Sequence, residues 1–199
     1  MVFSEKGYRG ATIADICDAA DANIALVNYY FGDKASLYDA VWRYAFDCAS
    51  KEFPLDGGVT DDDTPEMCLR ACIHAMLQRV FSTTCSGFFA RLMVQEMANP
   101  TLTLEHIVDD AIRPQTDHIC KILRQLLGME TVDRRVVMEC MLSILGQCLI
   151  YGFNRPVRSR LMGEHDFSEK DVEKLTDHIA AFSLAGLRTA RDRVAGVSA

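Results

Sequence analysis

Residues 12–34 read TIADICDAADANIALVNYYFGDK, and this stretch decides the fold class. Thr12 and Asp15 have the spacing of a capping box, in which a hydroxyl and a carboxylate bond the free N–H groups at a helix start. Asp21 falls at a tight turn, and Asn23 is a good N-cap for the helix that follows. Two short helices joined by a turn and followed at once by a third form the layout of a helix-turn-helix DNA reader.

The rest of the chain carries further helical patterns and no sustained β-type alternation. Residues 56–66 read as a solvated loop, and Pro114 is expected to break or kink the helix that contains it. The segment 131–154 is apolar on nearly all sides, so we expect it to be sandwiched between other helices. We therefore predict an all-α protein with helices over residues 1–6, 12–20, 24–30, 34–52, 65–84, 87–99, 102–128, 131–154 and 168–193.

The composition limits the classes of protein to which the chain can belong. It has 199 residues, of which 49% are hydrophobic and 25% are charged, so it can bury a core and is not disordered. Its net charge of −7 has the wrong sign for a generic nucleic-acid binder. Residues 1–52 hold five basic against eight acidic side chains, so any DNA binding must depend on a few well-placed groups.

The sequence predicts neither secretion nor a membrane span. Residues 1–10 lack an apolar signal-peptide core, and the longest uncharged apolar run, 140–153, is too short to cross a bilayer. We expect a soluble cytoplasmic protein with no membrane partner. The sequence contains no phosphate-binding glycine-rich loop and no GxSxG nucleophile elbow, so we expect no enzyme activity and no cofactor.

The chain has eight cysteines. They fall inside apolar helical patterns, and we interpret them as reduced thiols rather than disulfides. Cys68 and Cys72 have a spacing at which two ligands can share a metal, but His74 points about 160° away from Cys72 on an ideal helix. We therefore predict no metal site. A redox switch stays open as an alternative, because it needs an exposed thiol of low pKa that a sequence does not reveal.

The segment Glu5–Val41, EKGYRGATIADICDAADANIALVNYYFGDKASLYDAV, resembles the DNA-binding domain of the TetR (tetracycline-repressor) family. The spacing matches without a gap, and the matching positions are Gly7-Tyr8, Thr12-Ile13, Ile16, Ala19-Ala20, Tyr30-Phe31, Lys34 and Leu37. The words Gln95-Glu96-Met97 and Pro100-Thr101 are similar to one subgroup of that family. Asp21 stands where the family usually has glycine, and aspartate tolerates a left-handed backbone.

This resemblance implies a helix-turn-helix DNA-binding domain over residues 1–46 and a larger helical domain over 47–199 that binds a ligand and dimerises. It implies a homodimer that binds a palindromic double-stranded DNA operator and responds to a small-molecule effector. Repression is the more common mode in the family. The family's first helix is normally longer, so we expect this one to be truncated and a segment with phosphate-contacting basic residues to precede Met1.

The helix over 24–30 is the predicted recognition helix. Val27 and Phe31 are four residues apart and are expected to face inward, which turns the opposite face toward the major groove. The helix has no Arg or Lys, so Asn28 is assigned to adenine, and Ile24 and Ala25 to thymine methyl groups, in a half-site that favours A·T pairs. Three residues are assigned to phosphates, Thr12, Tyr30 and Lys34. The predicted DNA-binding residues are Thr12, Asn23, Ile24, Ala25, Asn28, Tyr29, Tyr30 and Lys34.

The resemblance also implies that the last two helices form the dimer interface, and their apolar stripes agree with it. The predicted interface residues are Met141, Leu145, Cys148, Leu149, Leu175, Ile179, Phe182 and Leu187. An effector pocket is expected among the middle helices, where polar or aromatic groups interrupt apolar segments. The predicted pocket residues are Phe88, Phe89, Arg91, Gln95, His118, Gln147 and Tyr151. Arg91 can clamp an anionic or carbonyl group, or instead pair with Glu96.

We therefore predict a ligand-responsive, sequence-specific transcriptional regulator, in the first instance a repressor that a small molecule releases from DNA. Two alternatives remain open. One is a helical ligand- or metal-binding protein whose shortened head no longer binds DNA, and weak or absent salt-dependent DNA binding would favour it. The other is a thiol-based redox regulator, which oxidation alone would release from DNA.

Overall fold

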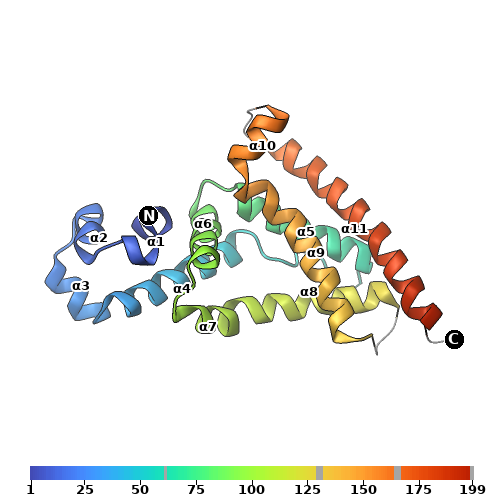
Figure 1. The fold of residues 1–199 in the computed structure, drawn as a ribbon, viewed down its shortest axis with the longest axis horizontal. Helices are drawn as coiled ribbons and strands as arrows, with labels where there is room; N and C mark the ends of the chain where they lie inside the picture. Colours follow the sequence, from blue (N-terminus) through green and yellow to red (C-terminus); the bar gives the residue numbers. More distant parts are fainter. Residues whose placement is uncertain (61, 129–131, 164–166, 198–199) are drawn as a thin grey trace. The chain divides into compact units, whose positions relative to one another are not determined.

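The computed structural model describes residues 1–60, 62–128, 132–163 and 167–197, and Figure 1 shows their helices. Every regular element within these ranges is helical, which confirms the predicted all-α class. The chain divides into two compact units. Unit 1 contains Met1–Glu52 and Ser82–Ile112, and unit 2 contains Phe53–Phe81 and Arg113–Ala199. These units are defined by packing, and a functional boundary after residue 46 stays a prediction.

Unit 1 is built from α1 (Val2–Gly10), α2 (Ile13–Ala20), α3 (Ile24–Phe31), α4 (Lys34–Glu52), α6 (Cys85–Ala98), α7 (Thr103–Ile107) and the π-helical turn η1 (Val108–Ile112). The bounds of α4 are those that the sequence predicts. Gly7, which was expected to stop the first helix, does break α1 with a φ of 68°, but one more turn follows as far as Gly10. Glycine is suited to this break because it lacks the Cβ that disfavours positive φ.

The helix expected over 102–128 is divided at its proline. Pro114 lacks an N–H donor, and its ring collides with the carbonyl group four residues earlier in a regular helix. The turn η1 replaces regular α-helix just before Pro114, which then lies in the first turn of α8 (Arg113–Leu127), where proline is tolerated. The expected break is therefore confirmed, and it takes the form of a π-helical turn.

Aromatic side chains form the core of unit 1. Tyr38 of α4 is fully buried, and its ring packs against Phe3 and Tyr8 of α1 at centroid distances of 4.8 and 5.0 Å. Further along α4, Trp42 packs edge-on against Phe89 of α6 at 5.7 Å. The first helix is thus held on α4, which in turn packs on α6.

Unit 2 is built from α5 (Pro65–Phe81), α8, α9 (Arg134–Phe153), α10 (Arg155–Met162) and α11 (Glu169–Val197). The predicted cap at Ser168 is confirmed, because its hydroxyl accepts a hydrogen bond from the Asp171 N–H at the start of α11. The described part of α9 begins at Arg134 rather than at residue 131, and Asp133 caps it by accepting a hydrogen bond from the Arg135 N–H. The short helix α10 corresponds to no helix predicted from the sequence. The buried core of unit 2 draws residues from α5, α8, α9 and α11.

Two cysteines are disulfide-bonded, which corrects the expectation that all eight are reduced thiols. Cys48 of α4 and Cys85 of α6 form a disulfide with a Cα–Cα distance of 6.2 Å, within unit 1. The pair is separated by 37 positions in the sequence, so only the packing of α4 on α6 brings the two residues together. The remaining six cysteines are free.

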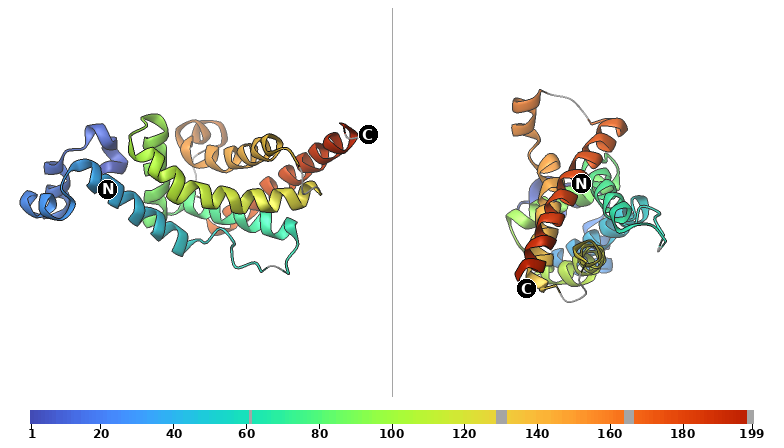
Figure 2. Two further views of the ribbon diagram at one scale, coloured as in Figure 1. Left: turned by 90° about the horizontal axis from the view of Figure 1, so that it is seen from below. Right: turned by 90° about the vertical axis from the view of Figure 1, so that its right-hand side faces the viewer.

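The apolar helix α9 is not sandwiched within its own chain. Only 22% of its window Arg134–Gly152 is buried, although this window is long and apolar enough to cross a membrane by length and composition. The window includes Arg134, Arg135 and Glu139, and the uncharged run 140–153 inside it remains shorter than a membrane span requires. A large apolar face of α9 lies open next to α11, and Figure 2 shows these two helices side by side (orange and red).

Candidate nucleic-acid interface

The start of α2 is held by a complete capping box. The Thr12 hydroxyl accepts a hydrogen bond from the Asp15 N–H at 3.0 Å, and the Asp15 carboxylate accepts one from the Thr12 N–H at 2.9 Å. Lys6 of α1 also donates to this carboxylate, at 2.7 Å. The hydrogen bonds from Lys6, and then from Thr12, lower the pKa of Asp15 to about 2. The predicted cap is confirmed, and Asp15 stays charged to low pH.

The turn between α2 and α3 contains the left-handed residue that the sequence predicts. Asp21 has φ 49° and ψ 44°, and it is the one described residue other than glycine with a positive φ. The Ala22 N–H donates to the Cys17 carbonyl oxygen at 2.9 Å and closes the end of α2. Asn23 then caps α3, because its side-chain oxygen accepts a hydrogen bond from the Ala25 N–H at 2.8 Å. This use of Asn23 occupies one of its acceptors.

The predicted recognition helix, α3, has a wide exposed surface without a charged side chain. Its exposed residues include those expected to face the major groove, Ile24, Ala25, Asn28 and Tyr29, and also Tyr30, which is assigned to a phosphate. Val27 is partly buried, as expected, whereas Phe31 is 39% exposed. The inward placement of Phe31 was therefore wrong. Phe31 lies in the last turn of α3, directly before Gly32, where the chain turns toward α4. Figure 1 shows α2 and α3 (blue) next to the N-terminal end of α4.

The two further residues assigned to phosphates have different settings. Thr12 is exposed, although its hydroxyl is engaged in the cap. Lys34 begins α4, is partly buried, and places its ammonium group 4.6 Å from the centre of the Tyr8 ring. This cation–π contact orients the lysine, while the N-terminus of α4 favours a nearby anion.

Glu96 is a buried carboxylate whose place between α4 and α6 was not predicted from the sequence. Its carboxylate is only 1% exposed and accepts hydrogen bonds from the Tyr38 hydroxyl at 2.8 Å, the Thr101 N–H at 2.6 Å and the Thr101 hydroxyl at 2.8 Å. Burial, chiefly, raises the pKa of Tyr38 well above its ordinary value, so its hydroxyl remains a donor. The motifs Gln95-Glu96-Met97 and Pro100-Thr101 were a signal for part of this network, because they place Glu96 and its partner Thr101 within one short stretch.

Gln95, next to Glu96 on α6, lies against α1. Its Oε1 lies so close to Gly7 that a Cβ at that glycine would come within 3.1 Å of it. The side chain of Gln95 therefore faces the break in α1, between the DNA-binding helices and α6. Gln95 lines neither the cavity beside α7 and η1 nor the groove between α9 and α11, so neither supports its assignment to an effector pocket.

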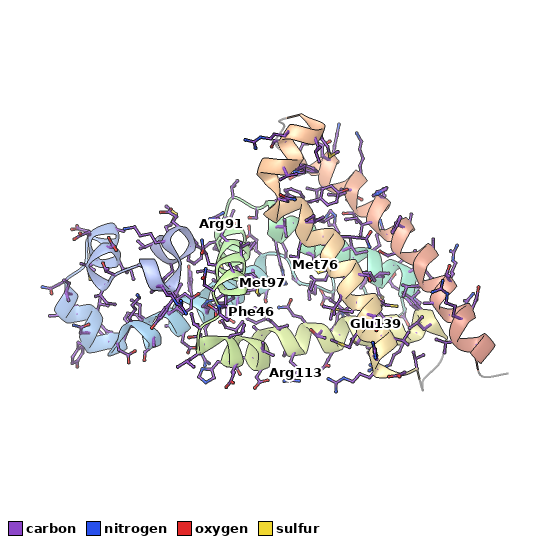
Figure 3. All side chains as sticks on the ribbon, viewed as in Figure 1. Phe46, Met76, Arg91, Met97, Arg113 and Glu139 are labelled. Carbon is purple, nitrogen blue, oxygen red and sulfur yellow. A yellow bond between two sulfur atoms is a disulfide. The ribbon has the colours of Figure 1, made fainter. Side chains whose placement is uncertain are left out.

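The predicted pocket residues are divided between the units. Phe88, Phe89, Arg91 and Gln95 belong to α6 in unit 1, whereas His118, Gln147 and Tyr151 belong to unit 2. Phe89 is buried against Trp42, and Figure 3 labels Arg91, whose side chain is exposed. His118 is exposed on α8. The burial of these residues therefore does not single out one pocket.

Among the cavities in the described part of the chain, one lies in each unit. In unit 1, a cavity of about 400 Å³ lies between α4 and the α7–η1 segment, lined by Trp42, Phe46 and the carboxylates of Asp39, Asp47 and Asp110. Arg43 bridges Asp39 and Asp110 at 2.9 and 3.3 Å. Asp39 and Asp47 both lie on α4 whereas Asp110 lies on η1, so no local signal connects Asp110 to the other two.

In unit 2, a groove of about 380 Å³ lies between α9 and α11. Gln147, assigned to the pocket, lines it and donates hydrogen bonds to the Ser143 carbonyl at 3.2 Å and the Ser183 hydroxyl at 3.3 Å. Glu139 on its edge is labelled in Figure 3.

The burial of α9 and α11 corrects the side chains assigned to the dimer interface. Five of the eight lie in the core of unit 2 and cannot reach a partner: Met141, Cys148, Leu175, Ile179 and Leu187. Leu145 and Leu149 are partly buried, and only Phe182 is exposed, at 66%. The apolar residues that these helices do leave open are Leu142, Ile150 and Phe182. On α9 the reason is that the helix is apolar on nearly all sides, so its pattern does not distinguish the inner face from the outer one. On α11 the apolar stripe is clear, but it is the face that packs within its own chain.

Cys72 and His74, which were considered as metal ligands, lie in different surroundings. Cys72 is fully buried, and burial raises the pKa of its thiol to about 12. His74 lies 3.1 Å from the Thr176 hydroxyl and 3.3 Å from the Glu173 carboxylate. No group of three or more His, Cys, Asp or Glu side chains that could hold a metal occurs among the described residues.

Comparison with known proteins agrees with this geometry. A family model described as bacterial regulatory proteins, tetR family, matches residues 1–41. A second, described as the C-terminal domain of the HTH-type transcriptional dual regulator CecR, matches residues 65–187. The dual regulator CecR of Shigella flexneri is 24% identical over 189 residues, covering 89% of this chain and 82% of that protein. The probable HTH-type transcriptional regulator YttP of Bacillus subtilis (strain 168) is 38% identical over 39 residues, covering 20% and 19%.

Solved structures show the same fold. The structure of apo AibR has a TM-score of 0.62 at 18% identity, with 90% of each chain covered. A transcriptional regulator of the TetR/AcrR family from Thermobifida fusca YX-ER1 has a TM-score of 0.56 at 16% identity, also with 90% of each chain covered. At these identities the similarity concerns the fold alone.

Proposed function

Since the chain belongs to the TetR family of transcriptional regulators, we propose that it is a ligand-responsive repressor that binds a palindromic DNA operator as a homodimer. The observation that supports this most is the capped helix-turn-helix, whose second helix exposes its whole predicted base-reading face. The Shigella relative is described as a dual regulator, so repression rather than activation is itself part of the proposal. A DNA-binding regulator of this kind works in the cytoplasm.

The test is selection of bound sequences from random duplex DNA by the purified protein, at several salt concentrations. We expect a palindromic motif whose half-site has A·T pairs at its centre, because α3 offers Asn28 and apolar side chains and no arginine. A motif with an invariant guanine core would contradict the base assignment. Failure to select any motif would contradict the regulator proposal and favour a helical ligand-binding protein.

The base-reading and phosphate-contacting roles in α3 can be separated by substitution. We expect Asn28→Ala to weaken binding to the selected duplex by about 10- to 100-fold and to relax preference at one base pair. Tyr30→Phe should weaken all sequences alike by about 5- to 10-fold, because it removes a hydrogen bond to phosphate. Tyr44→Phe is the matched control, since Tyr44 on α4 is 68% exposed, close to the 73% of Tyr30. Fluorescence anisotropy measures all three, and equal losses for Tyr30→Phe and Tyr44→Phe would remove Tyr30 from the interface.

The proposed dimer uses the open faces of α9 and α11. Leu142 and Ile150 on α9 and Phe182 on α11 are each more than half exposed, which is costly for large apolar groups unless a second copy covers them. Gly146 lies between Leu142 and Ile150 on α9, and Gly186 follows Phe182 by one turn on α11. A Cβ at either glycine would meet nothing within 4 Å, so space for an approaching helix exists there. A two-fold partner would complete the burial that α9 lacks in its own chain.

We expect Phe182→Glu to convert the dimer to monomer at micromolar concentration, because it places a charge in the centre of this apolar surface. Leu161→Glu on α10 is the matched control, since Leu161 is 79% exposed and lies outside α9 and α11. Analytical ultracentrifugation measures the mass. If Phe182→Glu remains a dimer, the interface lies elsewhere.

The effector is proposed to be a small molecule, and the cavity between α4 and α7–η1 is one place where it can be sought. Titration of a candidate into the protein–operator complex tests this: an effector lowers operator affinity, whereas a ligand that leaves affinity unchanged is not one. The residues Phe88, Phe89, Arg91, Gln95, His118, Gln147 and Tyr151 stay assigned to the pocket as a prediction.

A further inference from the structure

The disulfide between Cys48 and Cys85 joins two helices at a point where both sulfur atoms lie near the surface. Both residues are partly exposed, so small oxidants and reductants can reach them. Four of the six free cysteines, Cys17, Cys72, Cys120 and Cys148, are buried instead. Among these, burial raises the thiol pKa values of Cys72, Cys120 and Cys148, which makes them poor nucleophiles.

A second set of bonds holds the same two helix ends together. The Glu52 carboxylate, one turn after Cys48 on α4, accepts hydrogen bonds from the Thr84 hydroxyl at 2.6 Å and the Ser86 hydroxyl at 2.6 Å. These bonds hold the pKa of Glu52 below its ordinary value. They do not depend on the disulfide, so they keep the two thiols within reach of one another after the bond is reduced. Such a pair can open and close repeatedly.

The disulfide also lies where the chain passes between its two units. The chain leaves unit 1 after Glu52 and returns at Ser82, within four residues of Cys48 on one side and of Cys85 on the other. Through Tyr38 and Trp42, α4 also holds α1 and packs on α6. The oxidation state of this pair therefore determines how firmly the C-terminal end of α4, the helix that carries the DNA-binding head, is fixed to α6.

We propose that Cys48 and Cys85 form a reversible modification site that peroxide oxidises and a cellular dithiol reduces, and that its state regulates DNA binding. This inference rests on the proposed function, because a DNA-binding regulator works in a reducing compartment, where a disulfide is typically transient and redox-sensing rather than structural.

The chemistry balances with these two reactants. One thiolate attacks a peroxide oxygen, the O–O bond breaks, and a sulfenic acid and water or an alcohol result after proton transfer. The second thiol attacks that sulfur, the S–S bond forms, and water leaves. In all, two electrons pass from the two sulfur atoms to the peroxide. The dithiol reverses this by exchange, becoming a disulfide itself while Cys48 and Cys85 each regain a proton.

The chemical test needs no DNA. The full-length protein is reduced, freed of reductant, and treated with an equimolar amount of hydrogen peroxide. We expect a loss of two titratable thiols, one cross-linked peptide that joins Cys48 to Cys85, and full recovery with dithiothreitol. Cys140→Ser, at a partly exposed cysteine of unit 2, should behave as wild type, whereas Cys48→Ser should form no cross-link. A bond that stays closed in every mixture of reduced and oxidised glutathione would mark a structural staple and overturn the proposal.

The regulatory test uses the duplex selected above. We expect the oxidised and reduced proteins to differ by at least fivefold in affinity, and Cys48→Ser and Cys85→Ser to lose all response to peroxide. Equal affinity of the two forms would overturn the regulatory role while leaving the regulator proposal intact. If no duplex is selected at all, the proposed function fails, and regulation of DNA binding fails with it. Hydrogen exchange then still reports whether reduction loosens the last turn of α4, which is the structural premise.

Discussion

Glu96→Ala is expected to lower the free energy of unfolding by about 3 kcal/mol, because the buried carboxylate is the shared acceptor of the network that joins α4 to α6. Its removal leaves the Tyr38 hydroxyl without a partner in a fully buried position and opens a cavity beside it. The Thr101 N–H also loses its acceptor, at the turn that follows α6. Urea unfolding at one fixed protein concentration, followed by circular dichroism, measures the change.

Glu96→Gln is the matched control for this loss. The carboxamide has nearly the same volume and retains an oxygen that can accept from Thr101, while its NH₂ group can donate to the Tyr38 oxygen. We expect a loss of only about 1 kcal/mol. If Glu96→Gln were as destabilised as Glu96→Ala, hydrogen bonds from a neutral side chain at this position would not be enough to stabilise the fold. The negative charge of Glu96 would then be the essential property.

The second large effect concerns the disulfide. The double variant Cys48→Ser/Cys85→Ser is expected to be less stable than the oxidised wild type by about 4 kcal/mol, on a chain-entropy estimate for the loop that the bond closes. That loop spans 37 positions, including α5, so the unfolded chain gains considerable freedom when the bond is absent. Thermal and urea unfolding without reductant measure the difference.

Reducing conditions provide the control for the disulfide. With dithiothreitol present, the wild type and the double variant should unfold at nearly the same urea concentration, because neither then has the cross-link. A difference that persisted under reduction would show that the two serine side chains themselves, and not the missing bond, destabilise the variant.

Local sequence signals determined the helix-turn-helix. The cap at Thr12, the left-handed residue Asp21 and the cap at Asn23 act over spacings of a few residues. Their hydrogen bonds form within one turn of the chain, so their geometry follows from the order of residue types alone. For the same reason, the bounds of α4 and the break before Pro114 were predictable.

Only the tertiary structure decided which residues meet across long stretches of chain. Tyr38 and Glu96 are 58 positions apart, and Cys48 and Cys85 are 37 apart, so no spacing rule connects either pair. It also decided which faces of α9 and α11 are inner. The helix α9 is apolar on nearly all sides, and a periodic pattern gives direction only when one face is polar. The charged helix α11 has one apolar stripe, but the stripe alone does not tell whether its own chain or a second copy covers it. The sequence therefore determined that these helices bury apolar surface, while the packing of unit 2 decided that Met141 and Ile179 lie inside and that Phe182 lies outside.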